Sequence, residues 1–361
     1  MLSDVPHMAA VTVFDGRQQA SNAARPTVAP ARAYADLRRT VIAAGLLDRA
    51  YGYYAWRTAV SFALLGVAIA SAFVLPGGGW VVVQAVLLAF GSIQVALIGH
   101  DAGHLAVFRS TRANWLLGWV CWSLVLGVGF WYWYDRHNRH HASTNDLAAD
   151  PDLKWAGLVV YSDEVLTTRK TRARWLIRHQ ALLGPIYTFG LAFAFRAEGW
   201  SFAVHRLRGP RRAAELGLLA TSAVAWIAPC LVLGWTWLAT FILGQVLAGL
   251  YLALAVAPNH KGMPIWPADR PPSFLERQVL SSRNIMPHPI TDFVFGGLNY
   301  QIEHHLFPTL PRVNMGRARS IVKPFCSAHG LAYQEMGAFA SYRLVIAELR
   351  RVSRRADTIP T

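Results

Sequence analysis

Charged residues are scarce in this chain of 361 residues. Only 15% of the residues are Asp, Glu, Lys or Arg, whereas 54% are hydrophobic and 14 are tryptophan. Soluble domains of average composition are about one-quarter charged. The deficit of charge excludes an intrinsically disordered chain and argues against an ordinary water-soluble globule.

Cysteine is also scarce. The three cysteines, Cys121, Cys230 and Cys326, lie far apart, and no C-x-x-C pair occurs. Disulfide frameworks and cysteine-ligated metal sites need clustered or regularly paired cysteines. The sequence therefore excludes a disulfide scaffold and a cysteine-bound zinc or iron–sulfur site.

Lys and Arg are absent from two long apolar stretches, Thr58–Gly99 and Ala213–Ala257. A turn signal interrupts each stretch, Pro76–Gly79 in the first and Gly234 in the second. A membrane-spanning helix needs about 20 mostly apolar residues. We therefore predict an all-α integral membrane protein with four transmembrane helices in two hairpins, at about 58–75, 80–99, 214–233 and 236–257.

The basic residues predict the orientation of these spans. The chain has 35 Lys and Arg against 20 Asp and Glu, a net charge of +15, and every Lys and Arg lies before 58, within 100–212 or after 257. The positive-inside rule places these three regions, and hence both termini, in the cytoplasm. Topology and attraction to anionic membrane lipids explain the charge, so no nucleic-acid partner is expected.

The remaining segments complete the predicted organisation. The apolar run Trp115–Phe130 is expected to be re-entrant or in-plane, because a single crossing would put His100 and His137 on opposite sides. Leu182–Phe195 is a weaker in-plane candidate. Gln94 and Gln245, within predicted spans, are expected to make interhelical hydrogen bonds. We further expect no cleaved signal peptide, a disordered tail over 1–32, a surface helix over 33–56, one membrane domain over 33–335, helices at about 312–328 and 335–352, and a helical tail over 336–361.

Eight of the 13 histidines gather in short motifs next to the predicted spans. His100 and His104 form H-x-x-x-H; His137, His140 and His141 form H-x-x-H-H; His304 and His305 follow Gln301 in Q-x-x-H-H; and His260 comes just after the fourth span. Residues three or four apart share a helix face. With the predicted topology, all eight imidazoles lie on the cytoplasmic side, where the helix ends can converge.

Eight converging imidazoles point to metal binding. Neutral imidazole suits Zn, Cu, Fe and Ni, and eight ligands are too many for one ion but suit two. A lone H-x-x-x-H arises often by chance, whereas three clusters on one membrane face do not. The other histidines are expected at the surface or the membrane interface: His7, His179, His205, His288 and His329.

These motifs resemble the three histidine boxes of the integral-membrane fatty acid desaturases. The boxes read His100-Asp-Ala-Gly-His104, His137-Asn-Arg-His-His141 and Asn299-Tyr-Gln-Ile-Glu-His-His-Leu-Phe-Pro308. The similarity covers roughly 95–335 and includes Asn259–Pro264, Gln278–Asn284 and Phe295–Leu298. The Q-x-x-H-H form of the third box is similar to the branch that holds acyl-lipid, front-end and actinobacterial acyl-CoA desaturases.

The resemblance implies an O₂-dependent fatty acyl desaturase with a non-haem di-iron centre carried by a cytoplasmic helical cap and in-plane helices. His260 matches an additional family histidine, so the implied iron ligands are His100, His104, His137, His140, His141, His260, His304 and His305. The expected substrate is a long-chain acyl-CoA or acyl-lipid. Without a haem, flavin or iron–sulfur motif in the sequence, electrons are expected from an external ferredoxin or flavin-dependent reductase.

Polar residues near the boxes are expected to orient the imidazoles. The candidates are Asp101, Asn138, Asp150, Asn259, Asp292 and Gln301. A helix-cap role is an equal alternative for Asp101 and Asp150, and Gln301 replaces a histidine of other branches and is not assigned as a ligand. The open functional alternatives are a membrane di-iron hydroxylase or ketolase, a bis-histidine haem electron carrier and a metal transporter.

Overall fold

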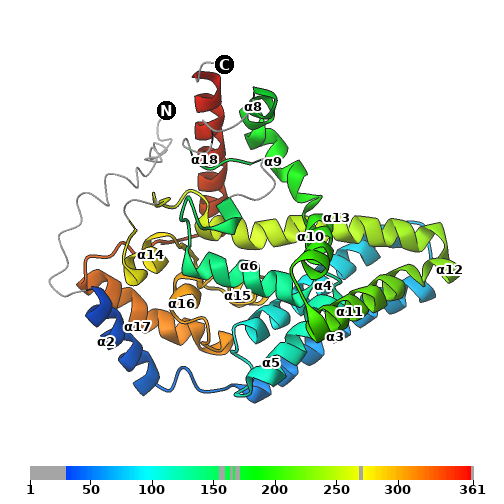
Figure 1. Cartoon of the computed structure of the whole chain (residues 1–361), viewed down its shortest axis with the longest axis horizontal. Helices are drawn as coiled ribbons and strands as arrows, with labels where there is room; N and C mark the ends of the chain where they lie inside the picture. Colours follow the sequence, from blue (N-terminus) through cyan, green and yellow to red (C-terminus); the bar gives the residue numbers. More distant parts are fainter. Residues whose placement is uncertain (1–29, 154–158, 163–165, 167–170, 268–270, 359–361) are drawn as a thin grey trace, which may run out of the picture.

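The computed structural model describes residues 30–153, 159–162, 166, 171–267 and 271–358, and these residues are mostly helical (Figure 1). The first half contains α2 (Pro30–Ala43), α3 (Tyr51–Val74), α4 (Trp80–Gly103), α5 (Thr111–Gly118), η1 (Trp119–Val125), α6 (Phe130–Ala142), η2 (Pro151–Leu153) and α8 (Thr171–Arg178). The middle contains α9 (Gln180–Thr188), α10 (Leu191–His205), α11 (Gly209–Ile227), α12 (Cys230–Leu233) and α13 (Trp235–His260). The last part contains α14 (Phe274–Leu280), β1 (Asn284–Ile285), α15 (Pro289–Val294), α16 (Gln301–Leu306), η3 (Arg312–Asn314), α17 (Met315–Ala328), β2 (Glu335–Met336) and α18 (Ala338–Thr358).

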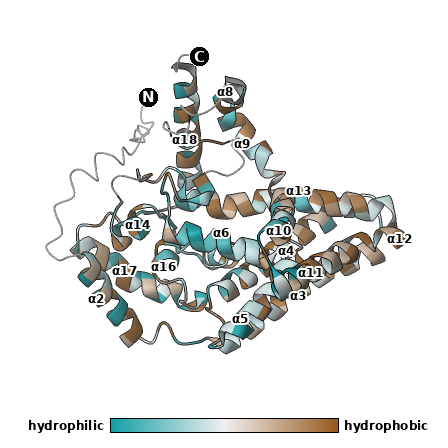
Figure 2. Ribbon diagram, viewed as in Figure 1, coloured by the Kyte–Doolittle hydropathy of each residue, from teal (hydrophilic) through white to brown (hydrophobic). Residues whose placement is uncertain are grey.

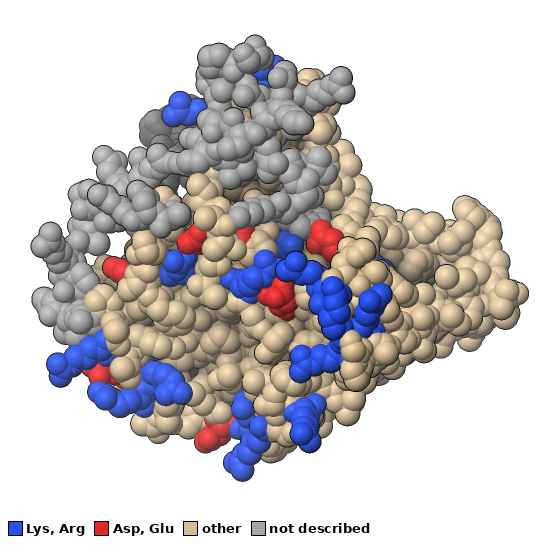
Figure 3. Space-filling model, in the orientation of Figure 1, with Lys and Arg blue, Asp and Glu red and all other residues tan. Residues whose placement is uncertain are grey.

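Four helical segments are long and apolar enough to cross a membrane, as the sequence predicts. They are Tyr51–Val74, Trp80–Gly103, Gly209–Leu233 and Trp235–His260. Hydrophobic residues predominate on α3, α11 and α12, whereas α6 is largely polar (Figure 2). In Figure 3, the end of the molecule formed by the tips of these long helices shows no charged side chain on the visible face.

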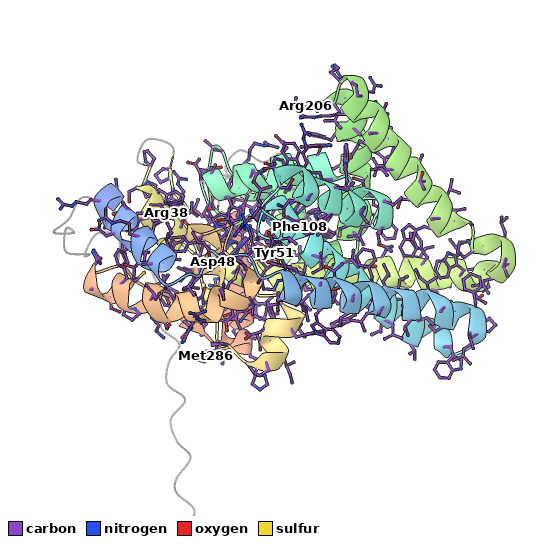
Figure 4. All side chains as sticks on the ribbon, turned by 90° about the horizontal axis from the view of Figure 1, so that it is seen from below. Arg38, Asp48, Tyr51, Phe108, Arg206 and Met286 are labelled. Atoms are coloured by element: carbon purple, nitrogen blue, oxygen red, sulfur yellow. The ribbon has the colours of Figure 1, made fainter. Side chains whose placement is uncertain are left out.

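Helix α4 is the centre of this bundle and packs against both α3 and α13. Gly91 allows the closest approach, because a Cβ at this position would lie 2.8 Å from the backbone of Leu65 on α3. Tyr51 is the first residue of α3, and Phe108 lies in the loop after α4. Their rings stack with centroids 6.4 Å apart (Figure 4). Gln94 of α4 donates to Tyr251 of α13, which confirms the interhelical role expected for it.

The long helices continue past the apolar windows that the sequence defines. Helix α3 begins at Tyr51, so the surface helix expected over 33–56 is wrong in extent: α2 ends at Ala43 and a separate helix follows. Gly45, at φ +67°, makes the break, because a left-handed residue ends a helix. Helix α2 also begins at Pro30, inside the tail expected over 1–32; residues 1–29 lie outside the described part of the chain.

The apolar run 115–130 does not form one straight helix. Thr111–Val125 and Phe130–Ala142 meet at a bend of 116°, and Gly129 at the bend has φ +94°. The buried carboxylate of Glu215 on α11 accepts a hydrogen bond from Ser123 Oγ at 3.1 Å, and Ser123 Oγ accepts from the Phe130 N–H. The rings of His100 and His137 lie 4.9 Å apart across this bend, and whether the run is re-entrant or in-plane remains a prediction.

The second pair of long helices is joined at Gly234, whose φ is +54°. Trp237 Nε1 on α13 donates to the Trp226 carbonyl on α11, which ties the two helices near this turn. Further along, α11 packs on η1 and α10, while α13 packs on α4 and α10. Gln245 of α13 accepts from Arg196 of α10 at 2.6 Å, so its interhelical bond is also confirmed.

The chain after α13 folds together with α2 around a small core and also forms a short pair of strands. Helices α2, α14, α16 and α17 share one core, which includes Leu37, Val279, Leu306 and Val322. Strands β1 and β2 pair in parallel, Asn284 with Glu335 and Ile285 with Met336. The helix expected over 335–352 is therefore wrong at its start, because residues 335–336 form a strand and α18 begins at Ala338.

Helix α18 leaves this region and packs against α8, α9 and α13 (Figure 1). Its contacts with α8 and α9 include Val352 with Ile177, and Gln180 Nε2 donates to the Leu349 carbonyl. The apolar run expected in-plane over 182–195 is divided between α9 and α10. The division of the chain into a tail, a domain over 33–335 and a C-terminal tail remains a prediction.

Candidate metal centre

The eight histidines of the sequence motifs come from four helices. His100 lies in the last turn of α4 and His104 follows directly as its C-cap residue. His137, His140 and His141 lie on α6, His260 is the last residue of α13, and His304 and His305 lie on α16. Spacings of three and four place His137 on the same helix face as His140 and His141, whereas the adjacent His304 and His305 point in different directions, with their rings 90° apart.

One group contains four imidazoles, those of His100, His104, His137 and His304. One ring nitrogen of each lies within 4.8 Å of the others. His104 Nε2 lies 2.9 Å from His137 Nε2, and the His100 and His304 ring centroids are 4.7 Å apart. Three separate regions of the chain contribute to this group.

A second group contains His140, His260 and His305, again with ligand nitrogens within 4.8 Å of one another. His140 Nε2 and His260 Nε2 are 3.4 Å apart. His141 forms a third set with His304 and His305 and stacks on His305 with centroids 4.1 Å apart. His141 therefore lies between the two larger groups.

The nitrogens fit metal ions and little else. His100 Nε2, His304 Nε2 and His305 Nε2 are buried and have no hydrogen-bond partner. Burial, with neighbouring imidazoles as the next cause, lowers the pKa of His104, His304 and His305 well below the usual range. The rings are therefore neutral near pH 7, which is the form that binds a metal. The Nε2 atoms of His104 and His137 are only 2.9 Å apart, which is too close for a haem ring to lie between the two imidazoles.

Each of the two larger groups has one imidazole held by a carboxylate. His100 Nδ1 lies 3.1 Å from Asp101 Oδ1, and His140 Nδ1 lies 3.1 Å from both oxygens of Asp150. Asp150 is fully buried and accepts backbone N–H bonds from Asn145 and Asp152 at 2.8 Å. A carboxylate at Nδ1 fixes the tautomer that leaves the Nε2 lone pair free for a metal.

Two further imidazole partners escaped the sequence analysis. The Ser281 carbonyl lies 2.9 Å from His260 Nδ1, and Gln278 Oε1 lies 3.0 Å from His305 Nδ1. Gln278 also donates to the His141 carbonyl at 2.9 Å, so one side chain holds two of the motifs. Both residues lie in or beside α14, far from the histidines in sequence. Their only signal was the family-like stretch Gln278–Asn284.

The structure places Gln301 at the second group. Its amide Nε2 lies 2.8 Å from His260 Nε2, and Asn259 Nδ2 donates to Gln301 Oε1 at 3.0 Å. Asn259 thus contacts the imidazoles only through Gln301. The side chain of Gln301 faces the same space as the His260 lone pair.

Like Asn259, the expected orienting residues Asp292 and Asn138 make no direct contact with an imidazole in the described part of the chain. Asp292 accepts from Asn299 at 2.7 Å and from the Tyr300 hydroxyl at 3.0 Å, so it braces the chain just before the third motif. Asn138 lies half-buried on α6 and makes no hydrogen bond to a histidine among the described residues. His137, His140 and His141 of the same helix form the site because they project from another side of α6.

The remaining histidines lie away from the centre. His179, His205 and His288 are exposed, and the ring of His329 hydrogen bonds to the Phe325 carbonyl at the end of α17. His288 caps α15 by accepting from the Ile290 N–H. His7 lies outside the described residues.

Comparison with known proteins agrees with this geometry. The family model "Fatty acid desaturase" matches residues 77–337. The chain belongs to the fatty acid desaturase family. The match includes all eight histidines, and together with the four apolar helices it identifies a membrane protein from a family of desaturase enzymes.

Curated relatives span most of the chain. An "Acyl-lipid (9-3)-desaturase" of Physcomitrium patens is 27% identical over 92% of this chain. A "Delta(6)-fatty-acid desaturase fat-3" of Caenorhabditis elegans is 28% identical over 88% of it, and a "Delta(8)-fatty-acid desaturase" of Euglena gracilis is 29% identical over 90%. The matches cover 64%, 74% and 79% of those proteins, respectively.

Proposed function

We propose that this chain is an O₂-dependent fatty acyl desaturase that introduces a C=C bond into a long-chain acyl substrate at a histidine-ligated di-iron centre. The observation that carries this proposal is the convergence of eight imidazoles into neighbouring groups, in which the Nε2 atoms of His100, His304 and His305 are buried and unpartnered. The names of the relatives, which include fatty-acid, acyl-lipid and sphingolipid desaturases, support the reaction and an acyl-lipid substrate. An acyl-CoA is the alternative substrate that we propose.

His100, His104, His137 and His304 would hold one iron ion and His140, His260 and His305 the other, with His141 next to both. Bound iron, together with O₂ and electrons from a donor, supplies the oxidising power needed to remove two hydrogens from adjacent unactivated methylenes. Burial, together with neighbouring imidazoles, lowers the pKa of His104, His304 and His305 and so keeps these rings neutral. Asp101, Asp150, the Ser281 carbonyl and Gln278 hold the tautomers of the imidazoles that they contact.

The surroundings of the imidazoles are suited to an apolar chain and exclude water. Trp133 is buried and stacks on His137 with centroids 4.7 Å apart, and Trp122 stacks on the Trp133 ring with centroids 4.9 Å apart. An acyl chain that enters from the membrane replaces water at the centre. Water exclusion protects the reacting methylenes from competing chemistry.

We further propose that both termini lie on the cytoplasmic side, together with the ends of α4 and α13 that carry His100 and His260. The two hairpin turns between the long helices would lie on the other side. The uneven distribution of Lys and Arg supports this orientation, and basic side chains lie along the face of Figure 3 away from the uncharged end. An external electron donor, a ferredoxin or a flavin-dependent reductase, would approach this basic side through acidic groups of its own.

Product analysis tests the function. Membranes that contain the protein are incubated with defined saturated acyl-CoAs or acyl-lipids, O₂ and a ferredoxin–reductase pair, and the products are measured by mass spectrometry. Loss of two hydrogens, with two irons per chain, supports a desaturase. Gain of one oxygen identifies the hydroxylase or ketolase alternative instead, and a Soret band identifies a haem protein.

A further inference from the structure

An arginine from the loop after the third histidine motif reaches the first motif. Arg312 begins η3, and only 5% of its surface is exposed. Its Nη2 lies 2.7 Å from Asp101 Oδ2 and donates to the Leu97 carbonyl of α4 at 2.6 Å. Asp101 in turn holds His100 Nδ1 through its other oxygen.

A second path joins the same residues and closes a ring of interactions. The backbone N–H of Arg312 donates to the Tyr54 hydroxyl at 3.2 Å, and this hydroxyl donates to Asp101 Oδ2 at 3.0 Å. Tyr54 is 2% exposed and Asp101 5%. Both paths end on one oxygen of Asp101, which leaves the other oxygen for His100.

Two glycines in the segment Phe295–Leu298, Gly296 and Gly297, leave space for the Arg312 side chain. Gly297 has φ +81°, and a Cβ there would lie 2.5 Å from Arg312 Cγ. At Gly296, with φ +57°, a Cβ would lie 2.5 Å from Leu97 Cδ1. The two glycines thus let the chain before the third motif pass against α4 and Arg312, and only glycine tolerates both the backbone angles and the contacts.

The second metal group is built differently. The Asp150 carboxylate that holds His140 receives two backbone N–H bonds, whereas the Asp101 carboxylate that holds His100 receives a guanidinium. A buried carboxylate without its cation is costly and loses its fixed orientation. The two groups therefore depend on different parts of the chain for the position of their carboxylate.

We propose that Arg312 is a positioning residue of the first metal group, acting through Asp101 on His100, and that its loss weakens one of the two metal sites selectively. This inference rests on the proposed di-iron function. Removal of partners that orient a metal-bound histidine typically weakens metal affinity by about 10–100-fold. We expect an effect of this size on one site and little effect on the other.

Anaerobic titration with ⁵⁷Fe(II), followed by metal analysis and Mössbauer spectroscopy, tests the proposal on the full chain in nanodiscs. The wild type is expected to bind two irons. Arg312→Gln should bind the first normally and the second about 10–100-fold more weakly. Arg319→Gln is the matched control, because it breaks the Arg319–Glu335 pair of 2.7 Å, which touches no imidazole, and it should keep both irons.

A double-mutant cycle separates this role from general stabilisation of the fold. If Arg312 acts through Asp101, adding Arg312→Gln to Asp101→Asn should weaken the site no further. The proposal is overturned if Arg312→Gln binds both irons with wild-type affinity or if it weakens both sites equally. Additive effects of the two substitutions in the double variant would also overturn it.

A variant that keeps the arginine covers the case in which Arg312→Gln does not fold. Tyr54→Phe opens the ring of interactions without removing a charge, and it should weaken the same single site by a smaller factor; unchanged affinities would overturn the proposal. A wild type that binds fewer than two irons would instead contradict the proposed function itself.

Discussion

Gly103 and Trp133 lie so close together that a methyl group on Gly103 would be 2.2 Å from ring atom Cζ3 of the indole. Trp133 in turn stacks on His137 and contacts His100 edge-on, with ring centroids 5.5 Å apart. Because the side chain of Gly103 is a single hydrogen, the first and second histidine motifs can approach each other this closely. The contact joins the end of α4 to the first turn of α6.

Gly103→Ala is therefore expected to displace Trp133 and, with it, His137. Overpacking of this kind costs about 1–3 kcal/mol, and we expect reduced iron content and at least a tenfold loss of activity. Gly66→Ala on α3 is the control, because a Cβ there meets nothing within 4 Å. Normal iron content in Gly103→Ala, measured by metal analysis of the purified protein, would contradict the prediction.

Removal of one imidazole from either metal group should abolish the reaction. We expect no product from His140→Ala or His304→Ala, together with lowered bound iron and unchanged helicity by circular dichroism. His205→Ala changes an exposed histidine and should retain wild-type activity. If both His140→Ala and His304→Ala remain active, these residues are not iron ligands.

Gln278 holds the second and third motifs together, so its loss should affect metal binding more than stability. Gln278→Leu removes one of the two partners of His305 Nδ1, leaving Thr144 Oγ1, and also removes the donor to the His141 carbonyl. We expect iron affinity to fall by about 10–100-fold. Gln180→Leu is a matched control, since Gln180 is equally buried and bonds to Val160 and Leu349 instead. It should lower the melting temperature but leave iron affinity unchanged; a similar loss of iron in both variants would refute the specific role of Gln278.

Glu303 predicts a pH dependence of stability. Burial raises the pKa of its carboxyl from 4.5 to about 7, against hydrogen bonds from Asn284 and Tyr333 that lower it. Between these two values the unfolded state binds fewer protons than the folded state, so stability falls as pH rises. The shift corresponds to roughly 3 kcal/mol.

Glu303→Gln mimics the protonated side chain and should remove this dependence. We expect the melting temperature of the metal-free protein to fall less between pH 5 and pH 8 in the variant than in the wild type. The comparison isolates the Glu303 carboxyl, because every other ionisable residue is the same in the two proteins. If the melting temperature changes equally with pH in the variant and in the wild type, Glu303 is already ionised in the folded protein at pH 5.

The sequence by itself determined the four long apolar helices, the eight histidines and the family. Apolar runs of about 20 residues and i, i+3, i+4 spacings are local properties, so Gln94, Gln245 and the histidine motifs could be assigned without a fold. The bend between His100 and His137 was also predictable, because a straight crossing would have separated rings that the chemistry requires together.

Only the tertiary structure decided which side chains surround the imidazoles. Gln278, Ser281, Tyr54 and Arg312 lie far along the chain from the histidines they serve, and no spacing rule connects a hydrogen-bond partner across such distances. Asn138 was expected at the site because it is adjacent in sequence, yet it projects from another side of α6. Proximity in a packed fold depends on helix faces and on close approaches such as those at Gly103 and Gly297, and these are fixed only when the helices pack.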